Sequence, residues 1–211
     1  MGILADTRFQ AVIFDLGGVL LRSPLPAITR YESEAGLPPG LIGRLVNAQG
    51  PDGPWAQLER GELEPEAFSN AFSRLAQTAG HHLDGLALLN HIWEETVVRE
   101  DMLAAVRKLR SIGLRTAALT NAWVTPNHPS RVEPLRPEFN CVLESFRLGT
   151  RKPERLIYEL ACRCLAVAPA KTIFLDDFGS NLKQARAMGM TTLKVSNPVA
   201  ALAELERLVG V

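Results

Sequence analysis

Residues 12–18 read Val-Ile-Phe-Asp-Leu-Gly-Gly, and this stretch decides how the rest of the chain is interpreted. Val12, Ile13 and Phe14 form a short apolar run that is typical of a strand buried on both faces. Asp15 ends the run, and the two glycines after it let backbone N–H groups approach an anion. We therefore expect a buried strand that delivers either a nucleophilic carboxylate or an ordinary turn aspartate.

Similar apolar runs recur in the second half of the chain. Amphipathic stretches with helical spacing separate them, and Pro or Gly marks most of their ends. Strands that alternate with helices of this length predict an α/β fold, a Rossmann-like doubly wound parallel sheet covered on both faces. The further strands are expected at 116–119, 141–143, 172–175 and 191–195. The helices are expected around 103–109, 156–164 and 182–188, with a last one that begins at Asn197-Pro198.

The segment 23–96 interrupts this alternation. It contains no convincing strand but several stretches with helical spacing, such as the one behind Pro65. We expect a helical cap inserted after the first strand, so that residues 1–22 and 97–211 form the α/β core. Such an insertion lies over the carboxyl ends of the strands, which is where open α/β sheets bind ligands.

Charge and cysteine usage exclude several classes of partner. The chain carries 23 Lys and Arg against 23 Asp and Glu, so we expect neither a nucleic acid nor a membrane as partner. The apolar stretch 11–21 is too short for a membrane span and has Asp15 at its centre. Cys141, Cys162 and Cys164 are odd in number and lack a zinc spacing, so we expect reduced thiols in a cytoplasmic protein. Nothing in the sequence indicates an oligomeric state.

Two further motifs offer ligands for an anion. Thr120 and Asn121 follow a predicted strand, so that a hydroxyl, an amide and backbone N–H groups reach the same edge of the sheet. An ordinary strand-end cap gives the same pattern and is commoner. Lys152 precedes a predicted helix, where its charge would neutralise both a nucleophile and a bound anion. A lone lysine at such a place is more often a solvated surface charge.

A pair of adjacent carboxylates, Asp176 and Asp177, ends the apolar run Ile173-Phe174-Leu175. Like charges at such a position repel each other unless a cation separates them. A hard divalent ion such as Mg²⁺, bound through oxygen, removes the repulsion. We therefore favour a metal site over two helix-capping aspartates.

The set Asp15, Thr120, Lys152 and Asp176-Asp177, in this order over nearly the whole chain, resembles the haloacid dehalogenase-like hydrolase superfamily. Within it, the chain is most similar to the phosphatase-like N-terminal domain of soluble epoxide hydrolases and to the related domain of some acyl-CoA dehydrogenases. The stretches that carry the likeness are 12–20, 53–55, 61–68, 119–123 and 174–190.

The resemblance implies a magnesium-dependent phosphatase that acts on a small phosphorylated metabolite. Asp15 would attack the phosphoryl group and form an aspartyl-phosphate. Its carboxylate, the Gly17 carbonyl and Asp177 would hold Mg²⁺, and Asp176 would support that site from behind.

The same resemblance implies a set of phosphate ligands. Thr120, Asn121 and the turn at Gly18 would hold the phosphoryl oxygens. Lys152 would keep Asp15 ionised and offset the charge that develops in the transition state.

Gly17 departs from the pattern of the superfamily's phosphatases, which usually carry Asp two residues after the nucleophile. That Asp protonates the leaving group and later activates water, a contribution of roughly 10² to 10⁴ in rate. Its loss slows the release of poor leaving groups such as alkoxides, while leaving groups that need no proton are affected less.

Three functions remain open, and we rank them in this order. The first is a phosphatase for phosphoric monoesters or acyl phosphates, which either needs no acid or borrows one from the insertion. The second is a catalytically weak or inactive phosphate-binding module, against which the retained motifs stand. The third is a 2-haloacid dehalogenase, a reaction that needs no acid but leaves the paired aspartates without a metal to bind. The candidates for a borrowed acid are Glu32, Glu34, His81 and His82.

Overall fold

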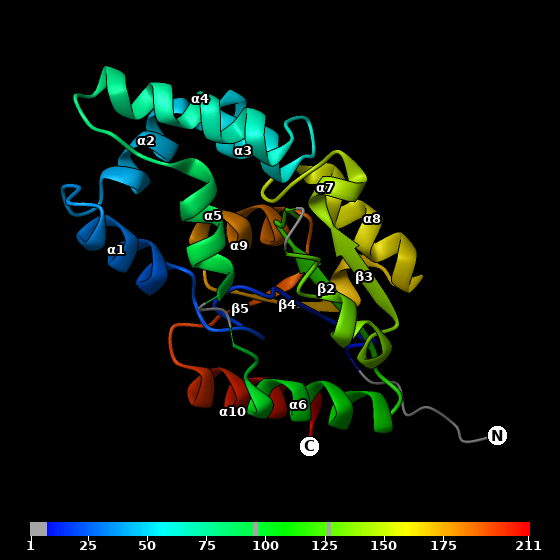
Figure 1. The fold of residues 1–211 in the computed structure, drawn as a ribbon. Helices are drawn as coiled ribbons and strands as arrows, with labels where there is room; N and C mark the ends of the chain where they lie inside the picture. Colours follow the sequence, from blue (N-terminus) through cyan, green and yellow to red (C-terminus); the bar gives the residue numbers. More distant parts are fainter. Residues whose placement is uncertain (1–7, 95–96, 126–127) are drawn as a thin grey trace.

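The computed structural model describes residues 8–94, 97–125 and 128–211. A sheet of five parallel strands lies at its centre, in the order β3-β2-β1-β4-β5 (Figure 1). The strands are β1 (Ala11–Phe14), β2 (Arg115–Thr120), β3 (Cys141–Glu144), β4 (Thr172–Asp176) and β5 (Thr191–Lys194). The predicted α/β class, a Rossmann-like doubly wound parallel sheet, is confirmed, and each strand lies within a residue or two of its expected position.

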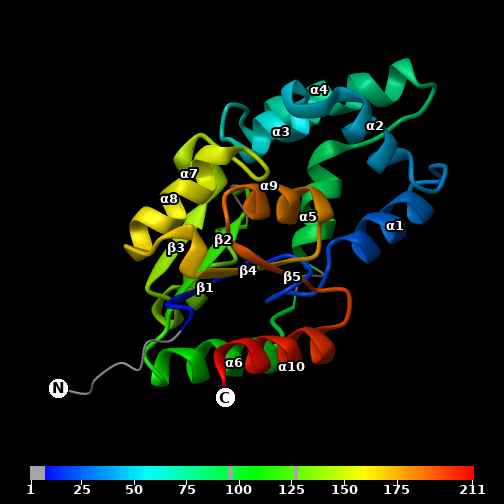
Figure 2. The ribbon, with the colours of Figure 1, turned by 180° about the vertical axis from the view of Figure 1, so that it is seen from behind.

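Helices cover both faces of the sheet, because strand side chains alternate between the two faces (Figure 2). In β1, Val12 and Phe14 pack in one apolar cluster with α6 and α10, while Ala11 and Ile13 pack in another with α8 and α9. All four of these β1 residues are fully buried, which places β1 at the heart of the core. The helices are α6 (Glu100–Ser111), α8 (Arg155–Leu165), α9 (Gly179–Ala187) and α10 (Pro198–Val209).

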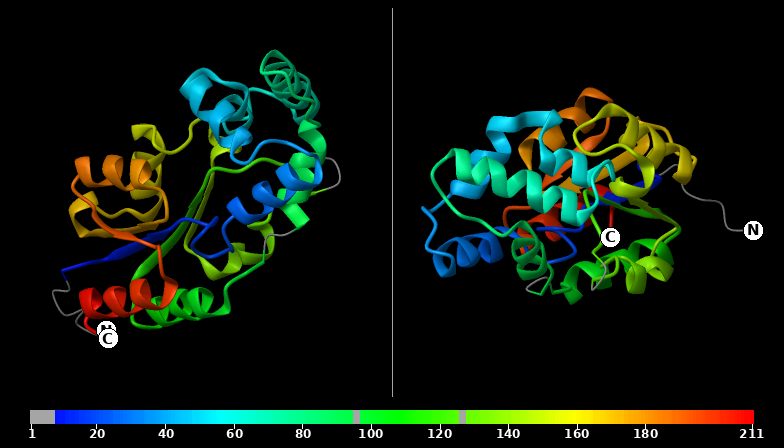
Figure 3. Two further views of the ribbon diagram at one scale, coloured as in Figure 1. Left: turned by 90° about the vertical axis from the view of Figure 1, so that its left-hand side faces the viewer. Right: turned by 45° about the horizontal axis from the view of Figure 1, so that its top comes forward.

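Between β1 and β2 the structure describes five α-helices and no strand in residues 25–94. We call them the cap helices: α1 (Leu25–Glu34), α2 (Leu41–Gln49), α3 (Pro54–Glu59), α4 (Pro65–Thr78) and α5 (Gly85–Glu94). They enclose an apolar cluster of their own, which includes Phe68 and Phe72, and they stand beyond one end of the sheet (Figure 3). The division between core and cap at residues 22 and 96 stays a prediction, and residue 96 lies outside the described residues.

Several short elements complete the fold. They are α7 (Ser145–Leu148) and the 3₁₀ helices η1 (Gly50–Asp52), η2 (Glu133–Glu138) and η3 (Pro169–Lys171). In the part of the chain that the structure describes, no helix is both long and apolar enough to cross a bilayer.

The expectation of reduced thiols is wrong for two of the three cysteines. Cys141, at the start of β3, and Cys164, in the last turn of α8, form a disulfide with their Cα atoms 6.2 Å apart. Cys162, on the same helix, is free and buried, and burial raises the pKa of its thiol. The bonded pair is separated by 23 residues in sequence, and the packing of α8 against β3 brings it together. Cysteine number and spacing do not reveal such a tertiary contact.

Candidate active site

The carboxyl ends of β1 and β4 bring two acidic side chains together. Phe14 pairs with Leu175 in the parallel register, and the Asp15 N–H donates to the Leu175 carbonyl at 2.9 Å. Asp15 and Asp176 are therefore neighbours at the same edge of the sheet. Both side chains are buried, and only strong compensation makes the burial of two carboxylates tolerable.

Lys152 supplies that compensation. Its Nζ lies 2.6 Å from Asp15 Oδ1 and 2.8 Å from Asp176 Oδ2. The side chain is only 2% exposed, so a solvated surface lysine is excluded. Burial by itself lowers the pKa of Lys152, but the charges of Asp15 and Asp176 outweigh burial and the net direction is upward. The lysine is therefore a permanent cation between two carboxylates.

Asp15 still lies in an environment that disfavours its negative charge. Burial raises its pKa well above the usual range, Lys152 lowers it in part, and Asp176 and Asp177 raise it further. The Leu16 N–H also donates to Oδ1 at 2.6 Å. A second cation beside Asp15 would remove the remaining repulsion.

The two adjacent aspartates differ in their partners. Asp176 is fully engaged: besides Lys152, it accepts from the Phe178 N–H at 2.7 Å and from Asn181 Nδ2 at 3.1 Å to each oxygen. Asp177 has a buried Oδ1 with no hydrogen-bond partner. Burial and the charge of Asp176 raise the pKa of Asp177 to about 6.

These carboxylates fit a divalent metal ion. Asp15, Asp176 and Asp177 each offer an oxygen atom, and the three atoms lie within 4.8 Å of one another. Such an all-oxygen set suits Mg²⁺, and the unpartnered Oδ1 of Asp177 is the atom that a cation would satisfy.

The turn after Asp15 leaves too little space for a side chain at position 18 but enough space for one at position 17. Gly18 has φ = +79°, which side chains rarely adopt, and a Cβ atom there would overlap the Asp177 carboxylate, so a larger residue would displace Asp177. A Cβ atom at Gly17 would instead meet only Pro24 Cδ, at the ordinary contact distance of 3.6 Å. The structure therefore has room for a side chain at position 17.

Thr120 and Asn121 follow β2 at the same edge as Asp15. Thr120 is buried, and its hydroxyl donates to the Asn121 carbonyl at 3.2 Å. The Asn121 carboxamide brackets the backbone of Lys152: Oδ1 accepts from the Lys152 N–H at 2.8 Å, and Nδ2 donates to the Lys152 carbonyl at 3.0 Å. The predicted contact of both residues with phosphoryl oxygens stays a prediction.

Glu59, at the end of α3, is a site residue that the sequence did not reveal. Its Oε2 accepts from Asn121 Nδ2 at 3.1 Å and from Arg151 Nε at 2.5 Å, and Oε1 accepts from Trp55 Nε1 at 3.0 Å. Burial raises its pKa, and the charge of Arg151 lowers it in part. The one signal in the sequence was its spacing of four residues from Trp55, which many exposed glutamates share.

The candidates for a borrowed acid lie elsewhere among the cap helices. Glu32 caps α2, because its carboxylate accepts from the N–H groups of Gly40 and Ile42 at 2.7 and 2.8 Å. Glu34 is exposed. His81 and His82 lie in the turn between α4 and α5. None of the four makes a described hydrogen bond to a site residue.

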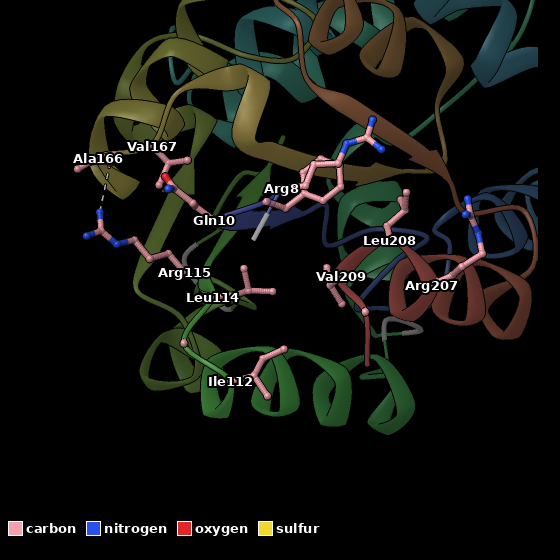
Figure 4. A pocket seen from close by; sticks show the side chains of 13 residues that line it. Arg8, Gln10, Ile112, Leu114, Arg115, Ala166, Val167, Arg207, Leu208 and Val209 are labelled. Atoms are coloured by element: carbon pink, nitrogen blue, oxygen red, sulfur yellow. Dashed lines mark hydrogen bonds between the residues drawn. The ribbon is translucent and has the colours of Figure 1, made fainter. Parts of the chain in front are cut away.

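A cavity of about 520 Å³ lies at the opposite edge of the sheet, where the strands begin (Figure 4). None of the predicted site residues lines it. The carboxyl-terminal ends of α6, α8 and α10 meet there, and Arg115 Nη1 donates to the carbonyls of Leu165 and Ala166. Arg115 therefore satisfies carbonyls at the end of α8, which is a structural role.

A parallel sheet with a helical insertion after its first strand, and with acidic, hydroxyl and lysine side chains at the strand ends, is the arrangement that the resemblance to haloacid dehalogenase-like hydrolases implies. The family model described as haloacid dehalogenase-like hydrolase matches residues 9–189, and the chain belongs to this family. The protein is therefore a hydrolase of this superfamily.

Curated relatives confirm the resemblance. The chain is 36% identical to acyl-CoA dehydrogenase family member 10 of Mus musculus, over 96% of this chain and 19% of that protein. It is 33% identical to bifunctional epoxide hydrolase 2 of Sus scrofa, over 96% of this chain and 39% of that protein. The chain thus spans about a fifth and about two fifths of these two relatives.

Two further matches cover most of this chain and most of the other protein. Sesquiterpene phosphatase astK of Aspergillus oryzae is 30% identical, over 97% of this chain and 98% of that protein. A haloacid dehalogenase family enzyme of Bacteroides thetaiotaomicron, solved with magnesium and inorganic phosphate, has a TM-score of 0.62 at 22% identity, over 88% of this chain and 93% of that one. This likeness to a solved structure supports the fold alone.

Proposed function

We propose that this hydrolase is a magnesium-dependent phosphatase for phosphoric monoesters or acyl phosphates of small metabolites, with Asp15 as nucleophile. The observation that carries the proposal is the buried Lys152 held between Asp15 and Asp176, next to an Asp177 oxygen without a partner. A dehalogenase has no use for such a metal-binding pair. Sesquiterpene phosphatase astK, similar over nearly its full length, supports the same choice.

The chain's own residues account for the first step. Lys152 and the Leu16 N–H hold Oδ1 of Asp15, so the attack on phosphorus falls to Oδ2. A bond forms between this oxygen and phosphorus, and the leaving group departs with the electrons of the bond that breaks. Mg²⁺, held by Asp15, Asp177 and the Gly17 carbonyl, would supply positive charge against the phosphoryl oxygens.

Water completes the cycle. It attacks phosphorus in the aspartyl-phosphate, the bond to Asp15 breaks, and inorganic phosphate leaves while the carboxylate is regenerated. Lys152 offsets negative charge in both steps, with Thr120 and the turn at Gly18 as proposed ligands of the phosphoryl oxygens.

Gly17 determines which substrates suit this site. No acid stands at position 17, and Glu32 is committed to the cap of α2. Acyl phosphates release a carboxylate that needs no proton, so we propose that they are turned over faster than alkyl phosphates. The same feature favours the second candidate, a phosphate-binding module with weak or no turnover.

A phosphate-release assay tests the proposal. The panel contains acetyl phosphate, p-nitrophenyl phosphate and sugar phosphates, each with and without Mg²⁺, for wild type and Asp15→Asn. Magnesium-dependent release that is lost in Asp15→Asn is expected. No release from any compound, with phosphate and Mg²⁺ still raising the melting temperature, would favour the binding module instead.

We also propose a cytoplasmic location for the protein. The Cys141–Cys164 disulfide is the feature that a reducing compartment would open. Cell fractionation checks the location: recovery of the protein in the cytoplasmic fraction is expected, and recovery outside it would contradict the proposal.

A further inference from the structure

Two ion pairs join the end of α3 to the loop that carries Lys152. We call Glu59 and Arg60 the cap latch. Glu59 Oε2 lies 2.5 Å from Arg151 Nε, and Arg60 Nη1 lies 3.1 Å from Glu154 Oε1. The next residue, Gly61, approaches the core so closely that a Cβ atom would lie 2.5 Å from the Phe146 carbonyl oxygen. The latch therefore docks tightly on the core.

The two latch residues differ in what they reach. Arg60 contacts Glu154, Glu62 and the Pro51 carbonyl, and none of these touches Asp15 or Lys152 in the described hydrogen bonds. Glu59 is buried and accepts from Asn121 Nδ2 at 3.1 Å. Glu59 therefore contacts Asn121 directly, whereas Arg60 reaches the Lys152 loop only through Glu154, which accepts from the Arg151 N–H at 3.2 Å.

A continuous chain of contacts runs from Glu59 to Asp15. Asn121 receives the contact from Glu59 and fixes the Lys152 backbone at both its N–H and its carbonyl. Lys152 Nζ then lies 2.6 Å from Asp15 Oδ1. A displacement of Asn121 would therefore move the lysine that orients the nucleophile.

Glu59 also pairs with the positive charge of Arg151. Arg151 is adjacent to Lys152 in sequence, and Glu59 is the carboxylate that pairs with its guanidinium. Without this partner, Arg151 would be an unpaired and largely buried cation in the loop that carries Lys152, and its side chain would have to move to find another partner. Burial raises the pKa of Glu59, and the charge and hydrogen bond of Arg151 lower it in part, so Arg151 favours the ionised carboxylate.

We propose that Glu59 is a positioning residue: through Asn121 and Arg151 it makes the placement of Lys152 beside Asp15 depend on the docking of the cap helices. The inference rests on the proposed phosphatase function. Its matched control is Arg60, which belongs to the same latch but makes no described hydrogen bond to Asn121, Lys152 or Asp15.

Kinetics of two variants test the inference. Glu59→Gln keeps the shape and removes the charge, so kcat for acetyl phosphate should fall by about 10²-fold with little change in KM, because misplaced reacting groups cost about this much. Arg60→Gln should leave kcat unchanged. Glu59→Asp restores the charge with a shorter reach and should recover part of kcat. Equal losses in Glu59→Gln and Arg60→Gln would show a merely structural latch and overturn the inference.

A double variant isolates the charge. Glu59→Gln/Arg151→Gln removes both partners and leaves no unpaired cation. Its kcat relative to wild type should therefore exceed the product of the relative kcat values of the two single variants. Strict additivity would contradict a role of Glu59 in holding Arg151 in place.

Amide hydrogen exchange separates this inference from the phosphatase proposal. The Lys152 N–H donates to Asn121 Oδ1 and should lose protection in Glu59→Gln but not in Arg60→Gln. If wild type released no phosphate, the phosphatase proposal would fail, and the exchange result would still decide the positioning role. Unchanged protection of Lys152 in Glu59→Gln would overturn it.

Discussion

The two ends of the parallel strands differ in the features that usually indicate a functional site. The edge where the strands end holds the buried charges Asp15, Lys152 and Asp176, with Asp177 beside them. The edge where they begin holds a cavity of about 520 Å³, bordered by arginines that include Arg115.

The difference lies in whether the charges are satisfied. At the cavity, Arg207 pairs with Glu204 at 2.6 Å with both side chains exposed, and Arg115 donates to the carbonyls at the end of α8. At the other edge, a buried oxygen of Asp177 lacks any partner and the pKa of Asp15 is raised. The comparison teaches why we place the proposed site at the end of the strands that holds unsatisfied buried charge rather than at the cavity.

The strongest test of this comparison is Asp177→Asn. The change removes the negative charge that a divalent ion needs, so magnesium-dependent phosphate release should fall to the metal-free level and Mg²⁺ should no longer raise the melting temperature. Glu204→Gln, at the other edge, is the control and should change neither quantity. A full magnesium response in Asp177→Asn would break the assignment of this edge as the metal site.

Gly17→Asp tests whether the absence of an acid at position 17 limits the release of phosphate from alkyl phosphates. The structure has space for the side chain, since a Cβ atom there meets only Pro24 Cδ at 3.6 Å. Release from alkyl phosphates should rise by up to about 10² to 10⁴, and release from acetyl phosphate should rise less, since it gains only from the activation of water in the second step. Gly17→Asn has the same shape but transfers no proton, so it should give no gain. An equal gain in both variants would contradict acid catalysis as the cause.

At the opposite edge, the double change Cys141→Ser/Cys164→Ser should act on stability alone. Loss of a cross-link over this chain length lowers the free energy of unfolding by about 3 kcal/mol. Urea denaturation measures the loss, and kcat should equal that of wild type. A fall in kcat of the folded variant would show that the two edges are not independent.

The smallest effect is expected for Arg115→Gln. Its guanidinium donates to two carbonyls at the end of α8, and the loss of such a contact costs about 1 kcal/mol. The urea midpoint should fall accordingly, with kcat unchanged. A loss of phosphate release would mean that the cavity takes part in catalysis.

Much of the fold was predictable because strand and helix periods differ sharply in this sequence. The runs at 116–119 and 172–175 became β2 and β4, since their apolar residues are buried against helices on both faces. Asp15 and Asp176 could be placed together for the same reason: polar residues that directly follow parallel strands meet at one edge.

Other features depended on contacts that no local pattern records. Glu59 has the appearance of a surface residue on a short helix, and only the docking of α3 buries it against Asn121 and Arg151. The bond between Cys141 and Cys164 likewise follows from the packing of α8 on β3. Both lie at junctions between elements that are distant in sequence.

The most direct measurement is to trap the covalent intermediate. Wild type with Mg²⁺ and acetyl phosphate is quenched in acid within the first turnover, digested and analysed by mass spectrometry. We predict one phosphoryl group on the peptide that contains Asp15, and none in Asp15→Asn. Phosphate release without a phosphoryl group at Asp15, or with the group on another residue, would contradict the account.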